Sequence, residues 1–312
     1  MEQVEIKWKK PWAVCLTALV CCLLWGSAFP SIKIGYQLFE IGSQDTASQI
    51  LFAGVRFALA GVLTVLIGSA MNKKILIPQK TSWTMILRLS LAQTVIQYFF
   101  FYIGLANTTG VKSSIINASN VFLALLISSV VFRMERLGAQ KIAGCLVGFF
   151  GVVLINLDGT GLNGGMKLMG EGFIFCSALS YAISSVLIKK YSQKENPVIL
   201  SGYQFAIGGV VMVVAGSVMG GQLHGFSAKA ILLLVYMAMI SAVAYSLWGI
   251  LLKYNPVGKV AVYGFMNPVF GVILSALLLG EQNQAFTLRG LISLIFVCVG
   301  IYIVNREKMQ SE

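Results

Sequence analysis

Long apolar stretches separated by short polar breaks run along the whole chain. Ten of them can be marked, at roughly residues 12–33, 49–71, 83–106, 112–132, 139–157, 170–189, 198–219, 230–252, 259–280 and 287–304. Most are long enough to cross about 30 Å of hydrocarbon at about 1.5 Å of helical rise per residue. They lack the two-residue alternation of barrel strands, and a lipid-facing span must satisfy its own backbone hydrogen bonds. The pattern therefore predicts an all-α polytopic membrane protein with ten transmembrane helices.

The basic residues between these stretches set the expected orientation. With the N-terminus inside, 16 Lys and Arg residues fall on the inner side and 5 on the outer side, while Arg56 and Arg88 lie within spans. This bias predicts a cell-membrane protein with both termini in the cytoplasm. The formal net charge of +12 is spread between apolar segments, so it indicates loop charge and not a nucleic-acid-binding surface.

The composition points the same way and offers little for chemistry. Hydrophobic residues make up 57% of the chain and charged residues 11%, against about 25% charged residues in soluble domains. All six cysteines fall inside apolar runs without metal-ligand spacing, so we interpret them as packing residues. We expect no catalytic residues, no metal and no cofactor.

The two halves of the chain resemble each other. ILFAGVRFALAGV at 50–62 aligns with VILSGYQFAIGGV at 198–210, and SNVFLALLISSVVFRME at 119–135 resembles MNPVFGVILSALLLGE at 266–281. The first alignment has an offset of 148 residues and superposes glycines and a phenylalanine, namely Gly54, Phe57 and Gly61 on Gly202, Phe205 and Gly209. We predict two five-helix units, at 1–157 and 158–312. Because five is odd, the second unit enters from the opposite side, an inverted repeat typical of alternating-access transporters.

Three short motifs carry a family resemblance. They are WGSAF with Lys33 four residues further on, Arg56-Phe57 in the second helix, and the acids Glu135 and Glu281 where two spans end. In this order and duplication they resemble the drug/metabolite transporter superfamily, and more narrowly its EamA type. The resemblance implies ten helices around a central cavity and secondary transport of small metabolites, often export of amino acids or related compounds.

Two positions depart from the repeated pattern. The family has a proline in the fourth helix, as Pro268 stands in the ninth, but the first half reads SNVF there. A hinge in the fourth helix is therefore without support. Gln204 stands where the second half would repeat Arg56.

Arg56 is the most informative single residue. A cation at the centre of a membrane helix costs about 2.5–3.5 kcal/mol on insertion scales, so it must face water, a carbonyl or an anion. No Asp or Glu lies in the middle of a span to pair with it. Two interpretations stay open: snorkelling or binding to a helix C-terminus, or a seat for a carboxylate or phosphate of the substrate.

Further candidates are aromatic, hydroxyl and amide side chains within the spans. The predicted substrate-binding set is Trp25, Ser27, Arg56, Gln93, Gln97, Tyr98, Tyr102, Asn117, Asn120, Tyr245, Trp248, Tyr263 and Asn267. Polar side chains in lipid need partners and so favour the bundle interior, where helix-to-helix hydrogen bonding or tight packing is the alternative role. As a set they indicate a neutral, aromatic-rich pocket for an amphipathic amino acid or amine, because aromatic faces also hold cations.

The remaining polar and small residues bear on mechanism and assembly. Glu135 and Glu281 sit at helix ends and the other acids in loops or tails, which gives no support to a proton relay at the bilayer centre. This favours movement down a gradient or substrate exchange, with proton coupling at a helix-end Glu left open. Gly144, Gly148 and Gly151 have the spacing of close helix contacts, either to a neighbouring helix or to a second protomer in a homodimer.

The leading hypothesis is therefore a secondary transporter that moves a small organic metabolite, an amino acid or related compound, outward by alternating access. An exchanger of phosphorylated or other anionic metabolites is the alternative, disfavoured because Arg56 lacks a second deep cation. An integral membrane enzyme acting on lipids would need a cluster of acids or histidines, and His224 stands alone in a loop. A channel is a third alternative. The expected partners are the small-molecule substrate and the lipid bilayer.

Labelling of single-cysteine variants in intact cells tests this orientation. We expect positions 72–82 to react only after the membrane is permeabilised and positions 157–169 to react from outside, because the basic residues hold the former segment in the cytoplasm. The reversed pattern would overturn the topology.

Overall fold

The computed structural model describes residues 8–133, 138–156, 167–255, 260 and 262–305. Glu135 and most of the predicted external loop at 157–169 lie outside these residues. All regular elements in the described ranges are helical, which confirms the all-α class. The main helices are α2 (Pro11–Leu38), α3 (Thr46–Asn72), α4 (Trp83–Leu89), α5 (Gln97–Ala106), α6 (Gly110–Asn117), α7 (Ser119–Leu126), α8 (Ala139–Asn156), α9 (Phe173–Tyr191), α10 (Pro197–Val218), α11 (Ala228–Tyr254), α13 (Met266–Leu279), α14 (Gln282–Ala285) and α15 (Leu288–Asn305).

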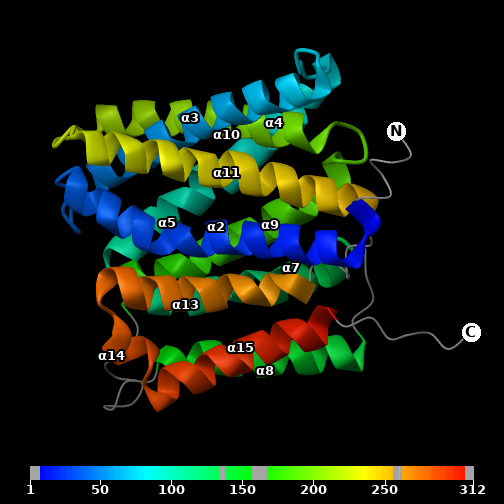
Figure 1. Ribbon diagram of the computed structural model, residues 1–312, viewed down its shortest axis with the longest axis vertical. Coiled ribbons are helices and arrows are strands. Elements are labelled where there is room, and N and C mark those ends of the chain that lie inside the picture. The colour runs from blue at the N-terminus through cyan, green and yellow to red at the C-terminus, as the bar shows by residue number, and fades with distance from the viewer. Residues whose placement is uncertain (1–7, 134–137, 157–166, 256–259, 261, 306–312) are drawn as a thin grey trace, which may run out of the picture.

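Seven helical runs are long and apolar enough to cross a membrane. Three further apolar helices are shorter, at Ala139–Ile155, Met266–Leu279 and Leu288–Val304. Each of the ten predicted segments coincides with one of these helices, so the chain is a multi-pass membrane protein, while ten crossings stay a prediction. The helices lie side by side in a layered bundle, with α3 and α10 at one end and α8 and α15 at the other (Figure 1).

Helices α3 and α10 touch through glycines. A Cβ atom added to Gly61 would collide with the backbone of Ala206, and one added to Gly209 would collide with the backbone of Ala58. The offset of 148 residues that relates the two glycines also relates the two alanines. Equivalent residues thus exchange contacts, as they do across a two-fold axis.

The same exchange recurs further along this pair. A Cβ on Gly54 would lie 2.5 Å from the Val213 nitrogen, and a Cβ on Gly202 would lie 2.7 Å from Val65 Cγ2. Along α3 the residue numbers rise while those of their partners on α10 fall, so the two helices run antiparallel. An inverted repeat requires this arrangement of its second and seventh helices.

A second glycine contact joins α8 to α15. A Cβ on Gly144 would lie 2.7 Å from Val304 Cγ2, and a Cβ on Gly300 would lie 2.6 Å from the Gly148 Cα atom. The predicted small-residue face of the fifth span therefore packs on another helix of the same chain. A homodimer stays a prediction.

The fourth and ninth spans are both irregular at matching positions. In the fourth span a single turn residue, Ala118, stands between α6 and α7, with backbone angles that stay helical (φ −63°, ψ −16°). In the ninth span a 3-10 turn, η5 (Val262–Phe265), leads into α13. Pro268 lies in the first turn of α13, where its missing N–H would have had no helical partner. A hinge in the fourth span therefore stays without support, because the backbone at Ala118 is still helical.

One carboxylate joins two loops at the end of the bundle predicted to be cytoplasmic. Glu195 accepts hydrogen bonds from Ser82 Oγ at 2.7 Å and from the Gln79 and Asn196 backbone nitrogens at 3.1 and 2.8 Å. Burial opposes ionisation of this carboxyl, but these donors outweigh it and hold its pKa below the usual value. The carboxylate form therefore stabilises the contact between the 73–82 loop and the 192–196 loop.

The glycine contact between α3 and α10 predicts a sharp loss of stability on enlargement. Gly61→Val should lower the free energy of unfolding by about 3 kcal/mol or more, because the Ala206 backbone cannot retreat from an added side chain. Gly42→Val is the matched control, since Gly42 lies in a loop with nothing within 4 Å of its added Cβ. Melting temperatures in detergent micelles measure both. Equal melting temperatures would contradict this packing.

The Glu195 contact predicts a pH dependence of stability. A carboxyl with a lowered folded-state pKa contributes stability above its unfolded pKa of about 4.3, and this contribution fades as the pH falls through the folded value. Glu195→Gln should therefore lower stability by about 1–2 kcal/mol at pH 7 and by much less at pH 3. Thermal unfolding at both pH values measures the difference, and a pH-independent effect would contradict the assignment.

Candidate functional site

Seven aromatic side chains form one connected cluster in the interior of the bundle. This aromatic cluster consists of Trp25, Phe57, Tyr98, Tyr102, Phe205, Tyr245 and Trp248, from α2, α3, α5, α10 and α11. Ring centroids lie 4.0 Å apart for Phe57 and Tyr98 and 5.0 Å apart for Phe205 and Tyr245. Trp25 continues the chain of contacts, at 5.5 Å from Tyr245 and 5.1 Å from Trp248. Five of the predicted residues are thereby brought together.

Arg56 enters this cluster from α3 and is only 3% exposed. Its Nε donates to the Met237 carbonyl at 3.2 Å, its Nη1 to Tyr102 Oη at 2.8 Å and its Nη2 to Ser241 Oγ at 3.4 Å. Its Cζ lies 4.9 Å from the centre of the Phe57 ring, which adds a cation–π contact. All three acceptors are neutral, so the guanidinium holds its charge without an anion among the described residues.

This geometry excludes snorkelling and binding to a helix C-terminus as roles of Arg56. A side chain so deeply buried does not snorkel, and the Met237 carbonyl lies within α11 and not at its C-terminus. The guanidinium has five N–H donors in a planar fork, which suits bidentate binding of a carboxylate. A seat for a carboxylate or phosphate therefore stays the open interpretation of Arg56.

Two partners that support this arrangement escaped the sequence analysis. Tyr36 Oη donates to the Tyr102 backbone carbonyl at 2.8 Å and so anchors α5 beside Arg56. Ser241 contacts the guanidinium from α11. A hydroxyl within an apolar run was the signal for each, but neither residue type is unusual there.

Three of the predicted residues carry a polar atom that is buried and has no hydrogen-bond partner among the described residues. These atoms are Trp25 Nε1, Gln97 Oε1 and Asn267 Oδ1. Buried polar atoms are rarely left unpaired, so a water molecule or a ligand is expected to satisfy them. Trp25 belongs to the aromatic cluster, while Gln97 adjoins Tyr98 on α5 and Asn267 lies in the first turn of α13.

Gln93 and Ser27 instead serve contacts between helices. Gln93 Oε1 accepts from Gln204 Nε2 at 3.0 Å, and Gln204 Oε1 accepts from Thr94 Oγ1 at 2.5 Å. Ser27 Oγ donates to the Leu24 carbonyl at 2.8 Å and lies 2.7 Å from Tyr236 Oη. Their polar groups are thus occupied within the protein.

The last three predicted residues lie apart from Arg56. Asn117 and Asn120 are half-buried and flank the turn residue Ala118. The Tyr263 carbonyl accepts from Cys22 Sγ at 3.4 Å, and its ring packs with Trp248 against a small apolar cluster at Val14, Ala18, Leu251 and Val260. Trp248 connects this region to the aromatic cluster.

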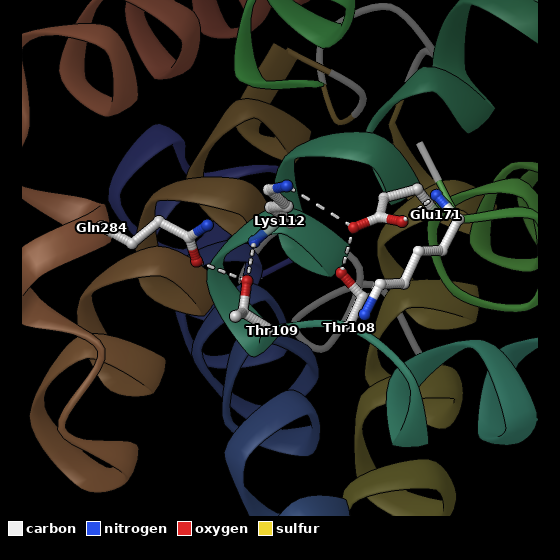
Figure 2. A network of polar contacts seen from close by, with 6 residues as sticks. Thr108, Thr109, Lys112, Glu171 and Gln284 are labelled. Atoms are coloured by element: carbon white, nitrogen blue, oxygen red, sulfur yellow. Dashed lines mark hydrogen bonds and ion pairs between the residues drawn. The ribbon is translucent and has the colours of Figure 1, made fainter. Parts of the chain in front are cut away.

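Glu171 corrects the expectation that the acids other than Glu135 and Glu281 lie in loops or tails. It lies in η4 (Leu168–Gly172), a π-helical first turn of the sixth span, and is 4% exposed. Its carboxylate accepts from Thr108 Oγ1 at 2.6 Å and from the Lys167 nitrogen at 2.9 Å, and lies 3.6 Å from Lys112 Nζ (Figure 2). Among the described residues no three His, Cys, Asp or Glu side chains cluster as metal ligands.

Comparison with known proteins gives a consistent family. The profile of the EamA-like transporter family matches residues 12–157 and 168–306. A protein of Escherichia coli named "Probable amino-acid metabolite efflux pump" is 26% identical, over 92% of this chain and 92% of its own length. An "Uncharacterized transporter" of Archaeoglobus fulgidus is 28% identical, over 92% of this chain and 96% of its own length.

A solved crystal structure shares the fold. It superposes with a TM-score of 0.66 at 17% sequence identity, covering 93% of this chain and 96% of that chain.

Proposed function

The chain belongs to the EamA-like transporter family, and on that premise we propose a substrate class and a mechanism. The protein is a secondary transporter that exports a small amphipathic metabolite bearing a carboxylate, such as an amino acid, by alternating access. The observation that carries the proposal is the buried Arg56, which has three neutral acceptors and no anionic partner in the described part of the chain.

The substrate carboxylate binds Arg56. A buried cation is costly when only neutral groups surround it. A carboxylate supplies the opposite charge, and its two oxygens can each accept a hydrogen bond from the guanidinium. Tyr102 and Ser241 already hold the guanidinium, so its orientation is fixed before the substrate arrives.

The rest of the substrate contacts the aromatic cluster. Tyr98, Tyr245 and Trp25 offer ring faces that accept an apolar side chain or an ammonium group. The unpaired Trp25 Nε1 and Gln97 Oε1 supply a donor and an acceptor for polar groups of the substrate. Such a mixture suits a zwitterion with an apolar portion better than a sugar.

Export is favoured over uptake by the relatives. The Escherichia coli relative is named as an efflux pump. The antiparallel pair α3 and α10 supports alternating access, because inverted halves can exchange conformations around a site between them.

A phosphate exchanger fits these residues less well. A doubly charged phosphate calls for a second cation near Arg56, and none is found there among the described residues. Arg88 is exposed on α4, and Lys112 pairs with Glu171 at a helix end.

Counterflow in proteoliposomes tests the role of Arg56. Arg56→Gln keeps a hydrogen-bonding side chain but removes the charge, so uptake of an amino acid should fall about 10- to 100-fold, the value of a hydrogen bond to a charged group. Uptake of the amine that has the same side chain but no carboxylate should fall much less in this variant. Arg88→Gln is the matched control, since the same change on an exposed arginine should leave both rates unchanged.

Two outcomes would contradict the proposal. Equal loss of both substrates, with a matching loss of melting temperature, would make Arg56 a residue of folding alone. Conductance without counterflow would indicate an open pore in place of a transporter.

A further inference from the structure

A five-residue segment, made of the end of the α5–α6 loop and the first turn of α6, is held by the second half of the protein on two sides. Every residue of this segment, Thr108–Lys112, makes a polar contact with either Glu171 or the α13–α14 region. In the predicted orientation it lies at the external end of the bundle. Figure 2 shows Glu171 on one side of the segment and Gln284 on the other.

On the first side, Glu281 binds the start of α6. Its two carboxylate oxygens accept from the Gly110 nitrogen at 3.0 Å and the Val111 nitrogen at 2.9 Å. These N–H groups have no partner within the helix, and the positive end of the helix dipole favours a carboxylate there. Thr109 Oγ1 donates to Gln284 Oε1 at 2.5 Å.

On the second side, Glu171 binds Thr108 Oγ1 at 2.6 Å and pairs with Lys112 Nζ at 3.6 Å. The same carboxylate accepts from the Lys167 nitrogen, so it is fixed to its own helix start. Thr108 and Lys112 are thereby tied to the sixth span.

The segment also closes tightly over α13. A Cβ on Gly110 would lie 2.6 Å from Ser275 Oγ and 3.0 Å from Ser275 Cβ. Ser275 is completely buried, and its hydroxyl has no partner among the described residues. Because Gly110 has no side chain, α6 can pack this closely on α13 and cover Ser275.

We propose that Thr108–Lys112 is the external gate of the transporter, and that Glu281 and Glu171 hold it closed. The inference rests on the proposed alternating access. Its contacts are polar and lie at a helix end, so water can replace each of them when the segment moves. The glycine contacts between α3 and α10 are backbone packing, for which water offers no substitute.

The helix start that holds Thr108 and Lys112 is itself irregular. Glu171 lies in a π-helical turn, and such irregular turns are frequent at functional sites.

Thiol accessibility tests the gate without any substrate. In a chain whose six native cysteines are replaced by alanine, Ser275→Cys places a thiol beneath Gly110. A hydrophilic maleimide should label it slowly in purified protein, and Glu281→Ala or Glu171→Gln should each raise the rate about tenfold, as expected for loss of a helix cap or a charged hydrogen bond. Glu195→Gln is the matched control, a buried carboxylate that binds loops at the opposite end.

Unchanged labelling in both gate variants would overturn the proposal. So would an equal rise in Glu195→Gln, because it would indicate general loosening of the bundle.

A reversible cross-link tests the gate in the folded protein. The Cβ separation at Gly110 and Ser275 is within about 1 Å of disulfide geometry, so Gly110→Cys with Ser275→Cys should form a disulfide on oxidation. Oxidised protein should lose at least nine-tenths of its counterflow and regain it on reduction, while each single variant stays unaffected by oxidant. Full counterflow of the cross-linked protein would overturn the gate.

The two proposals fail separately. If the cross-link stops transport but Arg56→Gln treats acid and amine alike, the gate stands and the substrate assignment fails. If Arg56→Gln spares the amine but the cross-linked protein still transports, the gate fails and the substrate assignment stands.

Discussion

Hydrocarbon offers no hydrogen-bond partners, so each polar group within the spans must find one inside the protein. This constraint orders the whole structure. It makes every span helical and gathers the polar side chains at the interior faces of the bundle. The guanidinium of Arg56 shows the constraint most clearly, because α5 and α11 each supply an acceptor for it. A group that the protein leaves unpaired at such a position, like Trp25 Nε1, is therefore a sign of a ligand or water.

Two different kinds of contact join the two halves. Helices α3 and α10 meet backbone to backbone through glycines, and dispersion at that distance is lost by any small displacement. The Thr108–Lys112 segment meets Glu171 and Glu281 through hydrogen bonds that water can take over. The first contact suits a fixed axis and the second a moving part, which is the combination that alternating access needs.

The repeat is symmetric in its packing and asymmetric in its charge. Gln204 occupies the position equivalent to Arg56, and Gln93 occupies the position equivalent to Ser241. Arg56 bonds to Ser241 and Gln204 bonds to Gln93, so the same helix contacts are kept with a neutral pair in one half and a cation in the other. Because only one of the two equivalent positions carries a charge, the site has one cationic end. Such a site suits a substrate whose two ends differ.

Much of the fold could be read from the chain alone. Apolar length located the helices, and the glycines at 54, 61, 202 and 209 identified the repeated pair, because only close helix contacts require small residues at that spacing. Arg56 and the amide and hydroxyl side chains were recognised as unusual within spans, since the cost of a charged or polar group in lipid is an intrinsic property of the side chain.

Only the tertiary structure decided which partners these groups meet. Two of the three acceptors of Arg56 lie more than 180 residues away on α11. Gln93, predicted in the same set, bonds to Gln204. Glu171 looked like a loop acid, but the structure places it in the first turn of the sixth span. The periodicity of the sequence indicates which side of a helix is polar. Which residue lies against that side depends on how distant segments pack together, and no single stretch of sequence determines this packing.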